Sequence, residues 1–125
     1  MTKMLLVDVH NNKVDTVEVD GLKDYYAALG CSCITIVRRT IGGKPFEIIC
    51  DDEGLLVDKP KVSAVDSALE GMLVGNLLIA SGEVTGDGEL TSIKGDELAT
   101  VLKNIRRAST NAYPRPYFRV TNMGY

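Results

Sequence analysis

Residues 33–50 read CITIVRRTIGGKPFEIIC, and the rest of the chain is arranged around them. Two runs rich in β-branched and aromatic residues flank Gly42-Gly43, a two-residue turn of the kind that closes a β-hairpin. Segments before this hairpin are placed to pack on it, and segments after it to extend its sheet. The sequence therefore predicts a central antiparallel hairpin.

The glycine turn also predicts the register of the hairpin. It places Arg38 opposite Glu47 and Arg39 opposite Phe46. Because side chains alternate along a strand, the two arginines are expected to leave it on opposite faces, and only one of them faces Glu47. Pro45 donates no ladder hydrogen bond, which favours an edge position near the turn.

The N-terminal third predicts a second hairpin and a helix. Residues 3–10 and 13–19 read as two strands joined by an asparagine-rich turn. Asp20 is expected to cap a helix whose apolar residues recur at helical spacing over 22–29. Gly30 is expected to end that helix.

The second half of the chain predicts one more buried strand and one more helix. Residues 55–69 read as a connector, partly helical around 64–69, and residues 72–80 read as one buried strand. Residues 89–93 read as a short strand or a lead-in to the last helix. That helix has acidic residues in its first turn, where the helix dipole favours them. Its expected apolar stripe consists of Leu98, Val101, Leu102 and Ile105, with Lys103, Arg106 and Arg107 on and beside the opposite face.

These elements predict an α+β fold: an antiparallel sheet of about five or six strands, two main helices and an extended C-terminal tail. The 125 residues fit a single ligand-binding domain over 1–125, with residues 108–125 as a tail that reaches across a subunit interface. Two prolines keep this tail extended. A homo-oligomer is therefore expected.

Composition excludes several classes of protein. The net charge of −3 argues against a binder of DNA or RNA polymers. No apolar run approaches membrane-spanning length, and no signal peptide is recognisable at the start. Three cysteines, two of them in Cys31-Ser32-Cys33, do not form a disulfide framework, so a reducing cytoplasm is expected. Both cysteines of this pair are expected to be buried small hydrophobes.

The basic end of the chain is the first candidate for anion binding. No acidic residue follows Glu97. The residues beyond it interleave cations and aromatics: Lys103, Arg106, Arg107, Tyr113, Arg115, Tyr117, Phe118 and Arg119. Arginine forks bind phosphate and aromatic faces stack bases, so this end fits a nucleotide-like anion. The alternative is that the cations complement a helix C-terminus and the aromatics dock on the domain.

Other candidates have two interpretations each. Arg38 and Arg39 either present their guanidinium groups from a strand to a bound phosphate, or one of them pairs with Glu47 and the other is solvated. Asn76, in an apolar run, satisfies a neighbouring backbone group or hydrogen-bonds a ligand. The acidic run 51–53 reads as a solvated turn rather than a metal site, and no catalytic acid–base set is recognisable. The sequence thus predicts no catalytic residue, metal or cofactor.

An ordered series of motifs carries a family resemblance. EIICDDEGLL at 47–56, MLVGNLLIA at 72–80, DGELTSI at 87–93 and a following amphipathic helix occur in this order. Over roughly residues 4 to 107 the chain resembles a family of small phage-encoded domains that includes the Thoeris anti-defence proteins of the first type. The same landmarks occur in a broader group of small phage and bacterial domains.

The resemblance implies a function without catalysis. Thoeris defence uses a TIR-domain enzyme that converts NAD into a cyclic ADP-ribose isomer, which activates a lethal effector in the infected bacterial cell. The anti-defence proteins bind this signal and release it unchanged. They look like homodimers, with pockets near the subunit interface, and also assemble as hexamers. Some members take up cyclic trinucleotides at separate sites.

The family's pocket uses arginines, an aromatic and an asparagine. The candidates in this chain, chosen by residue type and by their place in the chain, are Arg38, Arg39, Asn76, Arg106, Arg107, Tyr113 and Arg115. The expected function is sequestration of a cyclic ADP-ribose-type signal in the bacterial cytoplasm, with cyclic oligonucleotides as further ligands. The alternatives are a protein-interaction module that inhibits a host or phage protein and, third, a small enzyme that degrades the nucleotide.

Overall fold

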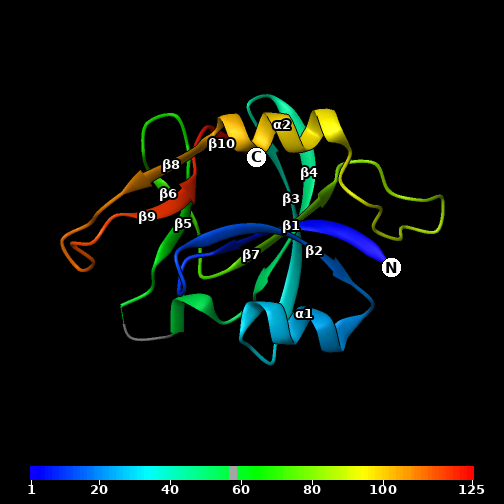
Figure 1. Ribbon diagram of the computed structural model, residues 1–125, viewed down its shortest axis with the longest axis horizontal. Helices are drawn as coiled ribbons and strands as arrows, with labels where there is room; N and C mark the ends of the chain where they lie inside the picture. The colour runs from blue at the N-terminus through cyan, green and yellow to red at the C-terminus, as the bar shows by residue number, and fades with distance from the viewer. Residues whose placement is uncertain (57–58) are drawn as a thin grey trace.

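A computed structural model describes residues 1–56 and 59–125. In this part the chain forms two α-helices and two β-sheets, so the α+β prediction is confirmed (Figure 1). In chain order the elements are β1 (Thr2–Asp8), β2 (Lys13–Val19), α1 (Leu22–Leu29), β3 (Ile34–Ile41), β4 (Lys44–Asp51), the 3₁₀ turn η1 (Gly54–Leu56), β5 (Val62–Val65), β6 (Gly71–Val74), β7 (Leu77–Ser81), α2 (Gly95–Lys103), β8 (Ile105–Ala108), β9 (Tyr117–Val120) and β10 (Met123–Gly124).

The larger sheet has six strands in the order β10-β3-β4-β7-β1-β2, and every neighbouring pair is antiparallel. The hairpin register is as predicted, with Arg38 opposite Glu47 and Arg39 opposite Phe46. It follows from a two-residue turn in which Gly42 and Gly43 have φ of 57° and 86°. Positive φ at both positions is the requirement of a tight hairpin turn, and glycine meets it without strain.

The first helix ends as predicted but begins differently. Gly30 stops α1 in the left-handed conformation, with φ of 65°, and its N–H donates to the carbonyl of Tyr26. The capping position is Gly21 rather than Asp20. The N–H of Asp20 instead donates to the Asp24 carboxylate at 2.7 Å, so the acidic side chain that closes this end comes from inside the helix.

A second, four-stranded sheet, in the order β6-β5-β9-β8, was not predicted. Residues 62–65 form β5, where a partly helical connector was expected, and that connector also includes residues 57 and 58, which lie outside the described residues. The predicted single strand 72–80 is also wrong. Gly75, with φ of 75°, breaks it into β6 and β7, which belong to different sheets.

The last helix is shorter than predicted. It ends at Lys103, and Ile105, Arg106 and Arg107 lie in β8. The apolar stripe is therefore limited, and Leu102, 48 % exposed, is not part of the core. Asn104 closes the helix, and its carbonyl accepts hydrogen bonds from the backbone and side chain of Thr121.

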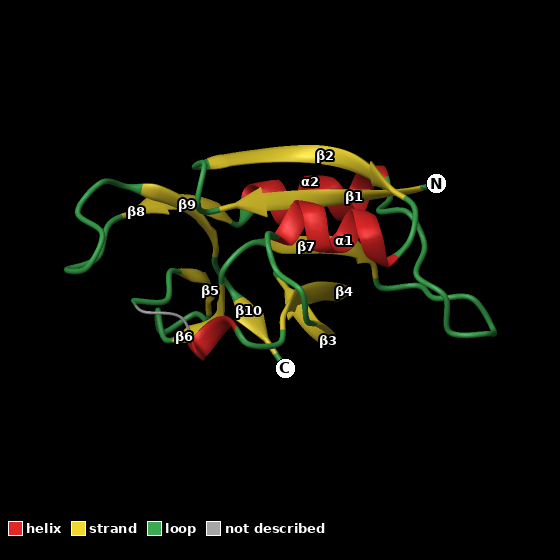
Figure 2. Ribbon diagram, turned by 90° about the horizontal axis from the view of Figure 1, so that it is seen from below, coloured by secondary structure: helices red, strands yellow, loops and turns green. Residues whose placement is uncertain are grey.

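The C-terminal tail folds back on its own chain. Strand β9 lies between β5 and β8, and β10 pairs with β3 at the edge of the larger sheet. The loop between β8 and β9 projects from the body of the chain, as both views show (Figures 1 and 2). This projecting loop carries two of the candidate residues, Tyr113 and Arg115.

The larger sheet is covered on both faces. Figure 1 shows α1 and α2 on opposite sides of β1 and β7. Leu29 of α1 packs in one apolar cluster with Ile49 and Leu78. Val101 of α2 packs in a second cluster, which also takes in Tyr117 and Val120 of β9 and Ala64 of β5. No helix in the described residues is long and apolar enough to cross a bilayer.

Candidate functional site

Two adjoining hollows form the candidate site, and together they are called the basic groove. The first, of about 240 Å³, lies among the β1–β2 turn, η1, the start of β5 and the β6–β7 turn. The second, of about 340 Å³, is lined by the β8–β9 loop. Both include Lys61 and Tyr113. The polar and aromatic side chains of the groove are His10, Asp51, Lys59, Lys61, Asn76, Tyr113 and Arg115.

Lys61 is held in a fixed position at the centre of the basic groove. Its ammonium donates to the carbonyl of Val9 at 2.9 Å. It also lies 4.8 Å from the ring centroid of Tyr113 and 4.7 Å from that of Tyr117, within cation–π range of both. An ammonium held in this way offers a positive charge to the groove without the entropy cost of ordering a free lysine.

The ring of Tyr113 is fixed as well. It meets the ring of Tyr117 edge to face, with centroids 6.3 Å apart and planes at 77°. Its hydroxyl donates to the carbonyl of Lys59, a residue with φ of 54°. Lysine rarely adopts this left-handed conformation, and such backbone geometry concentrates at binding sites. The Tyr113 ring thus provides a fixed aromatic surface on which a planar group can stack.

The side chain of Asn76 hydrogen-bonds to two backbone groups. It is 6 % exposed; its Oδ1 accepts the N–H of Val9 at 2.9 Å and its Nδ2 donates to the carbonyl of Ala28 at 3.3 Å. These bonds tie the β6–β7 turn to the end of β1 and to α1. Of the two interpretations of this residue, the structure shows the backbone one, and Asn76 contributes to the groove as part of its wall.

The charge of the basic groove is positive overall. Three cations line it, Lys59, Lys61 and Arg115, against the one carboxylate of Asp51. That carboxylate also accepts the N–H of Glu53 at 2.9 Å, which engages one of its oxygens. A low-dielectric hollow strengthens the attraction between such cations and a bound anion. The groove is therefore suited to a phosphate-bearing ligand.

The central arginines lie outside the groove. Arg38 donates from Nη1 to Glu47 at 2.9 Å and to the carbonyl of Gly82 at 3.0 Å, as the cross-strand interpretation predicts. Arg39 leaves the opposite face of β3, where its guanidinium lies 4.8 Å from the ring centroid of Tyr125. The two side chains cannot meet one ligand in one copy of the chain, because the sheet separates them.

The arginines of β8 have local partners too. Arg106 donates from Nη1 to the carbonyls of Lys103 and Ile105 at 2.7 and 2.8 Å, and so closes the C-terminal end of α2. Arg107 lies 5.3 Å from the ring centroid of Phe118 on β9. Three of the seven predicted residues, Asn76, Tyr113 and Arg115, thus meet in the groove, and the four others do not.

The sequence does not point to four side chains of the groove: His10, Asp51, Lys59 and Lys61. The first stands in a turn, and the lysines belong to a segment that reads as a connector. A signal was present, because Lys59-Pro60-Lys61 directly precedes the apolar run 62–65, and a β-rich run after proline favours a strand start.

The cysteines do not build a site. All three are free thiols: Cys50 is buried, Cys31 half-buried and Cys33 exposed, so the expectation that Cys33 is buried is wrong. Burial raises the pKa of the Cys50 thiol to about 11, and it stays protonated at neutral pH. Within residues 1–56 and 59–125, no three histidine, cysteine, aspartate or glutamate side chains gather in a way that would hold a metal ion.

Comparison with known proteins places the chain in a family. Residues 1–106 match DUF3846, a domain of unknown function. The chain belongs to the DUF3846 family. No curated protein and no solved structure gives a significant match. The part that matches DUF3846 contains Lys61 and Asn76, whereas Tyr113 and Arg115 lie beyond it, so one half of the basic groove comes from the family domain and the other from the tail.

Proposed function

We propose that the protein binds a cyclic ADP-ribose-type signal nucleotide in the basic groove and sequesters it without cleaving it. The observation that carries the proposal is the fixed ammonium of Lys61 beside the Tyr113 ring, with Arg115 lining the same hollow. A pyrophosphate and a base are the two chemical groups that such a set recognises. The resemblance to Thoeris anti-defence proteins supplies the ligand class.

In this proposal each side chain has one task. Lys61 neutralises a pyrophosphate charge from a fixed position, and Arg115 donates two parallel hydrogen bonds to phosphate oxygens. The ring of Tyr113 stacks on the adenine. Because Lys61 and Tyr113 are held by backbone carbonyls before any ligand arrives, binding avoids an ordering cost of about 0.5–1.5 kcal/mol for each.

We further propose that the groove is completed in a homodimer or hexamer. Arg115 is exposed and stands on the projecting β8–β9 loop, where a second copy of the chain has access to it. A preformed oligomeric pocket encloses a ligand more fully than a groove open on one side. Light scattering on the purified protein gives the oligomeric state, and a strict monomer would contradict this part of the proposal.

The ligand proposal is tested by incubation and recovery. The protein is mixed with the product of an activated TIR-domain enzyme, freed of unbound ligand and heat-denatured, and the supernatant is analysed by mass spectrometry. The expected result is recovery of intact cyclic ADP-ribose isomer, with linear ADP-ribose as the matched control ligand retained far less. Recovery of cleaved nucleotide would identify an enzyme, and recovery of no nucleotide would favour the protein-interaction alternative; either would overturn the proposal.

A further inference from the structure

A further hollow lies between the two sheets and adjoins the basic groove, with which it shares Asp51 and Gly54. It is called the acidic cleft and has a volume of about 350 Å³. Its walls come from β3, the end of β4, η1 and β6. The volume falls in the lower part of the range found for small-molecule sites in proteins.

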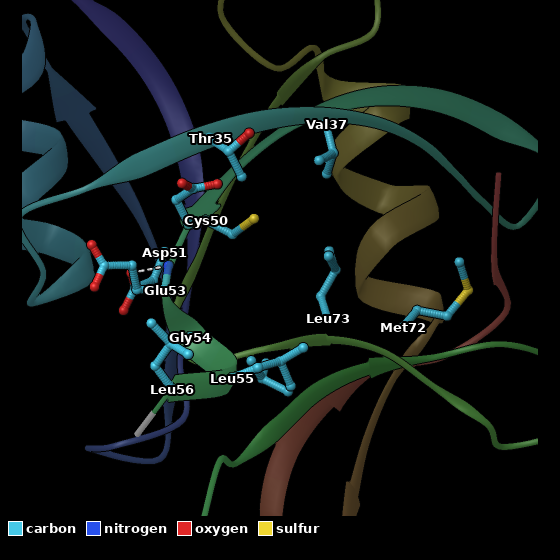
Figure 3. A pocket seen from close by; sticks show the side chains of 12 residues that line it. Thr35, Val37, Cys50, Asp51, Glu53, Gly54, Leu55, Leu56, Met72 and Leu73 are labelled. Atoms are coloured by element: carbon cyan, nitrogen blue, oxygen red, sulfur yellow. Dashed lines mark hydrogen bonds between the residues drawn. The ribbon is translucent and has the colours of Figure 1, made fainter. Parts of the chain in front are cut away.

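The interior of the acidic cleft is apolar. Figure 3 shows Val37 of β3 and Leu73 of β6 pointing toward one another across the cavity, with the Cys50 sulfur directed into it. Val37 and Leu73 are only half-buried, although both pack against the main apolar cluster. The thiol of Cys50 stays neutral at physiological pH, since burial raises its pKa to about 11. These side chains offer a ligand an apolar surface.

Within the described residues, the charged side chains that line the acidic cleft are all acidic. Asp51, Asp52 and Glu53 are the charged side chains that line it. None of the three is in an ion pair with another residue of the described chain. Arg39 lies two positions beyond Val37 on the same face of β3, where its positive charge opposes the rise in the pKa of the Cys50 thiol, and its guanidinium lies 4.8 Å from the ring centroid of Tyr125. The three carboxylates outnumber this guanidinium, so an occupant meets an excess of negative charge.

The mouth of the cleft extends the apolar surface. Leu55 and Leu56 of η1 line it and are 75 % and 78 % exposed. Two leucines and a cavity of this size provide far less surface than the roughly 800 Å² per partner that a stable protein interface needs. The cleft thus fits a small molecule better than a protein.

We propose that the acidic cleft is a second ligand site, which takes a small organic cation with an apolar body, of the class of primary alkylamines and arylalkylamines. The apolar body fills the space between Val37 and Leu73. The ammonium lies at the rim, which Asp51, Asp52 and Glu53 line. An organic anion is disfavoured by the same carboxylates. The cleft and the basic groove therefore select ligands of opposite charge.

Three probes of equal chain length test the proposal: octylamine, octanol and octanoate, each titrated into ¹⁵N-labelled protein and followed by NMR. Octylamine is expected to bind saturably, with shift changes confined to the cleft. Its affinity should exceed that of octanoate by about tenfold or more, with octanol between them. Equal affinity for octylamine and octanoate, or no saturable binding of octylamine, would overturn the proposal.

Two exposed carboxylates allow a test that leaves the fold intact. Asp52→Asn and Glu53→Gln should each weaken octylamine binding by about two- to fivefold, as expected for exposed charge pairs, and leave octanol binding unchanged. The matched control is Glu89→Gln, an exposed carboxylate outside the cleft. Octylamine affinity that is unaffected by the double rim variant would contradict the assignment of the ammonium to the rim.

The apolar half of the site has its own pair of variants. Leu55→Ser, at the exposed mouth, should weaken octylamine and octanol alike by about threefold or more, whereas Leu69→Ser, at an exposed leucine of the β5–β6 turn, should change neither. Circular dichroism confirms that both variants are folded. Equal effects of the two leucine changes would place the alkyl chain outside the cleft.

Discussion

Replacement of the buried Asn76 by alanine is expected to destabilise the fold by about 1.5–4 kcal/mol. The main contribution is the N–H of Val9, a residue with no exposed surface, which loses its acceptor at 2.9 Å. An unsatisfied buried donor costs about 1–3 kcal/mol. The longer bond to the carbonyl of Ala28, at 3.3 Å, adds about 0.5–1 kcal/mol, because that carbonyl sits at the end of α1 and keeps a second lone pair.

The expected loss translates into a large shift in melting temperature. Unfolding entropies near 60 °C are about 2.1 cal/mol/K per residue, which gives roughly 260 cal/mol/K for this chain of 125 residues. Each kcal/mol then lowers the Tm by about 4 °C. The Asn76→Ala variant should therefore melt about 6–15 °C below the parent protein.

Urea denaturation followed by circular dichroism measures the change in the free energy of unfolding. Asn111→Ala, at an exposed asparagine of the β8–β9 loop, is the matched control and should stay within about 0.5 kcal/mol of the parent. An Asn76→Ala variant as stable as the parent would show that the N–H of Val9 does not depend on the Asn76 side chain. The amide would then be free to serve a ligand instead of the backbone.

Two further predictions concern stability. Gly82→Ala should lower the free energy of unfolding, measured by urea denaturation, by more than about 3 kcal/mol, because the added Cβ would clash with the carbonyl oxygen of Pro45. Gly86→Ala, with open space around it, is the control and should cost less than about 1 kcal/mol. Similar losses in the two variants would contradict the close packing at Gly82. The pKa of Asp8 is lowered: burial raises it, but hydrogen bonds, chiefly from Asn11, outweigh burial. Because the pKa of Asp8 is lower in the folded than in the unfolded chain, its carboxylate stabilises the fold at neutral pH and loses this effect as the pH falls below about 4. Asp8→Asn should therefore make the free energy of unfolding depend less steeply on pH in this acid range. An unchanged slope would contradict the assignment.

The parts of the fold with local signals were predictable. The Gly42-Gly43 turn determines the register of β3 and β4, since both glycines adopt the positive φ that a two-residue hairpin requires. Gly30 ends α1 for a similar reason. In both places glycine, which adopts a positive φ without strain, separates two segments with regular hydrophobic patterns.

The parts that depend on partners distant in sequence were not predictable. Residues 72–80 form one apolar run in the sequence. In the structure the positive φ of Gly75 divides this run into two strands that belong to different sheets. Strand β5 is short and gains its partners from β6 and from β9, which lies more than fifty residues later. Such a strand exists because of tertiary pairing, and its own sequence carries little periodicity.

The candidate site was half predictable for the same reason. Tyr113 and Arg115 stand out in a basic, aromatic tail, and residue chemistry alone identifies them. Lys61 becomes a site residue only because β5 brings it between the rings of Tyr113 and Tyr117. Arg106 has the right chemistry, but the end of α2 engages its donors.

The contrast between Arg115 and Arg106 offers the most direct test of the central claim, that the basic groove binds the nucleotide. Isothermal titration calorimetry with a TIR-produced cyclic ADP-ribose isomer compares the parent with Arg115→Ala and Arg106→Ala. We expect Arg115→Ala to weaken binding by about 10- to 100-fold, the value of a charge-assisted hydrogen bond, and Arg106→Ala to change it by less than about twofold. Equal affinity in all three proteins, or a loss confined to Arg106→Ala, would contradict the central claim.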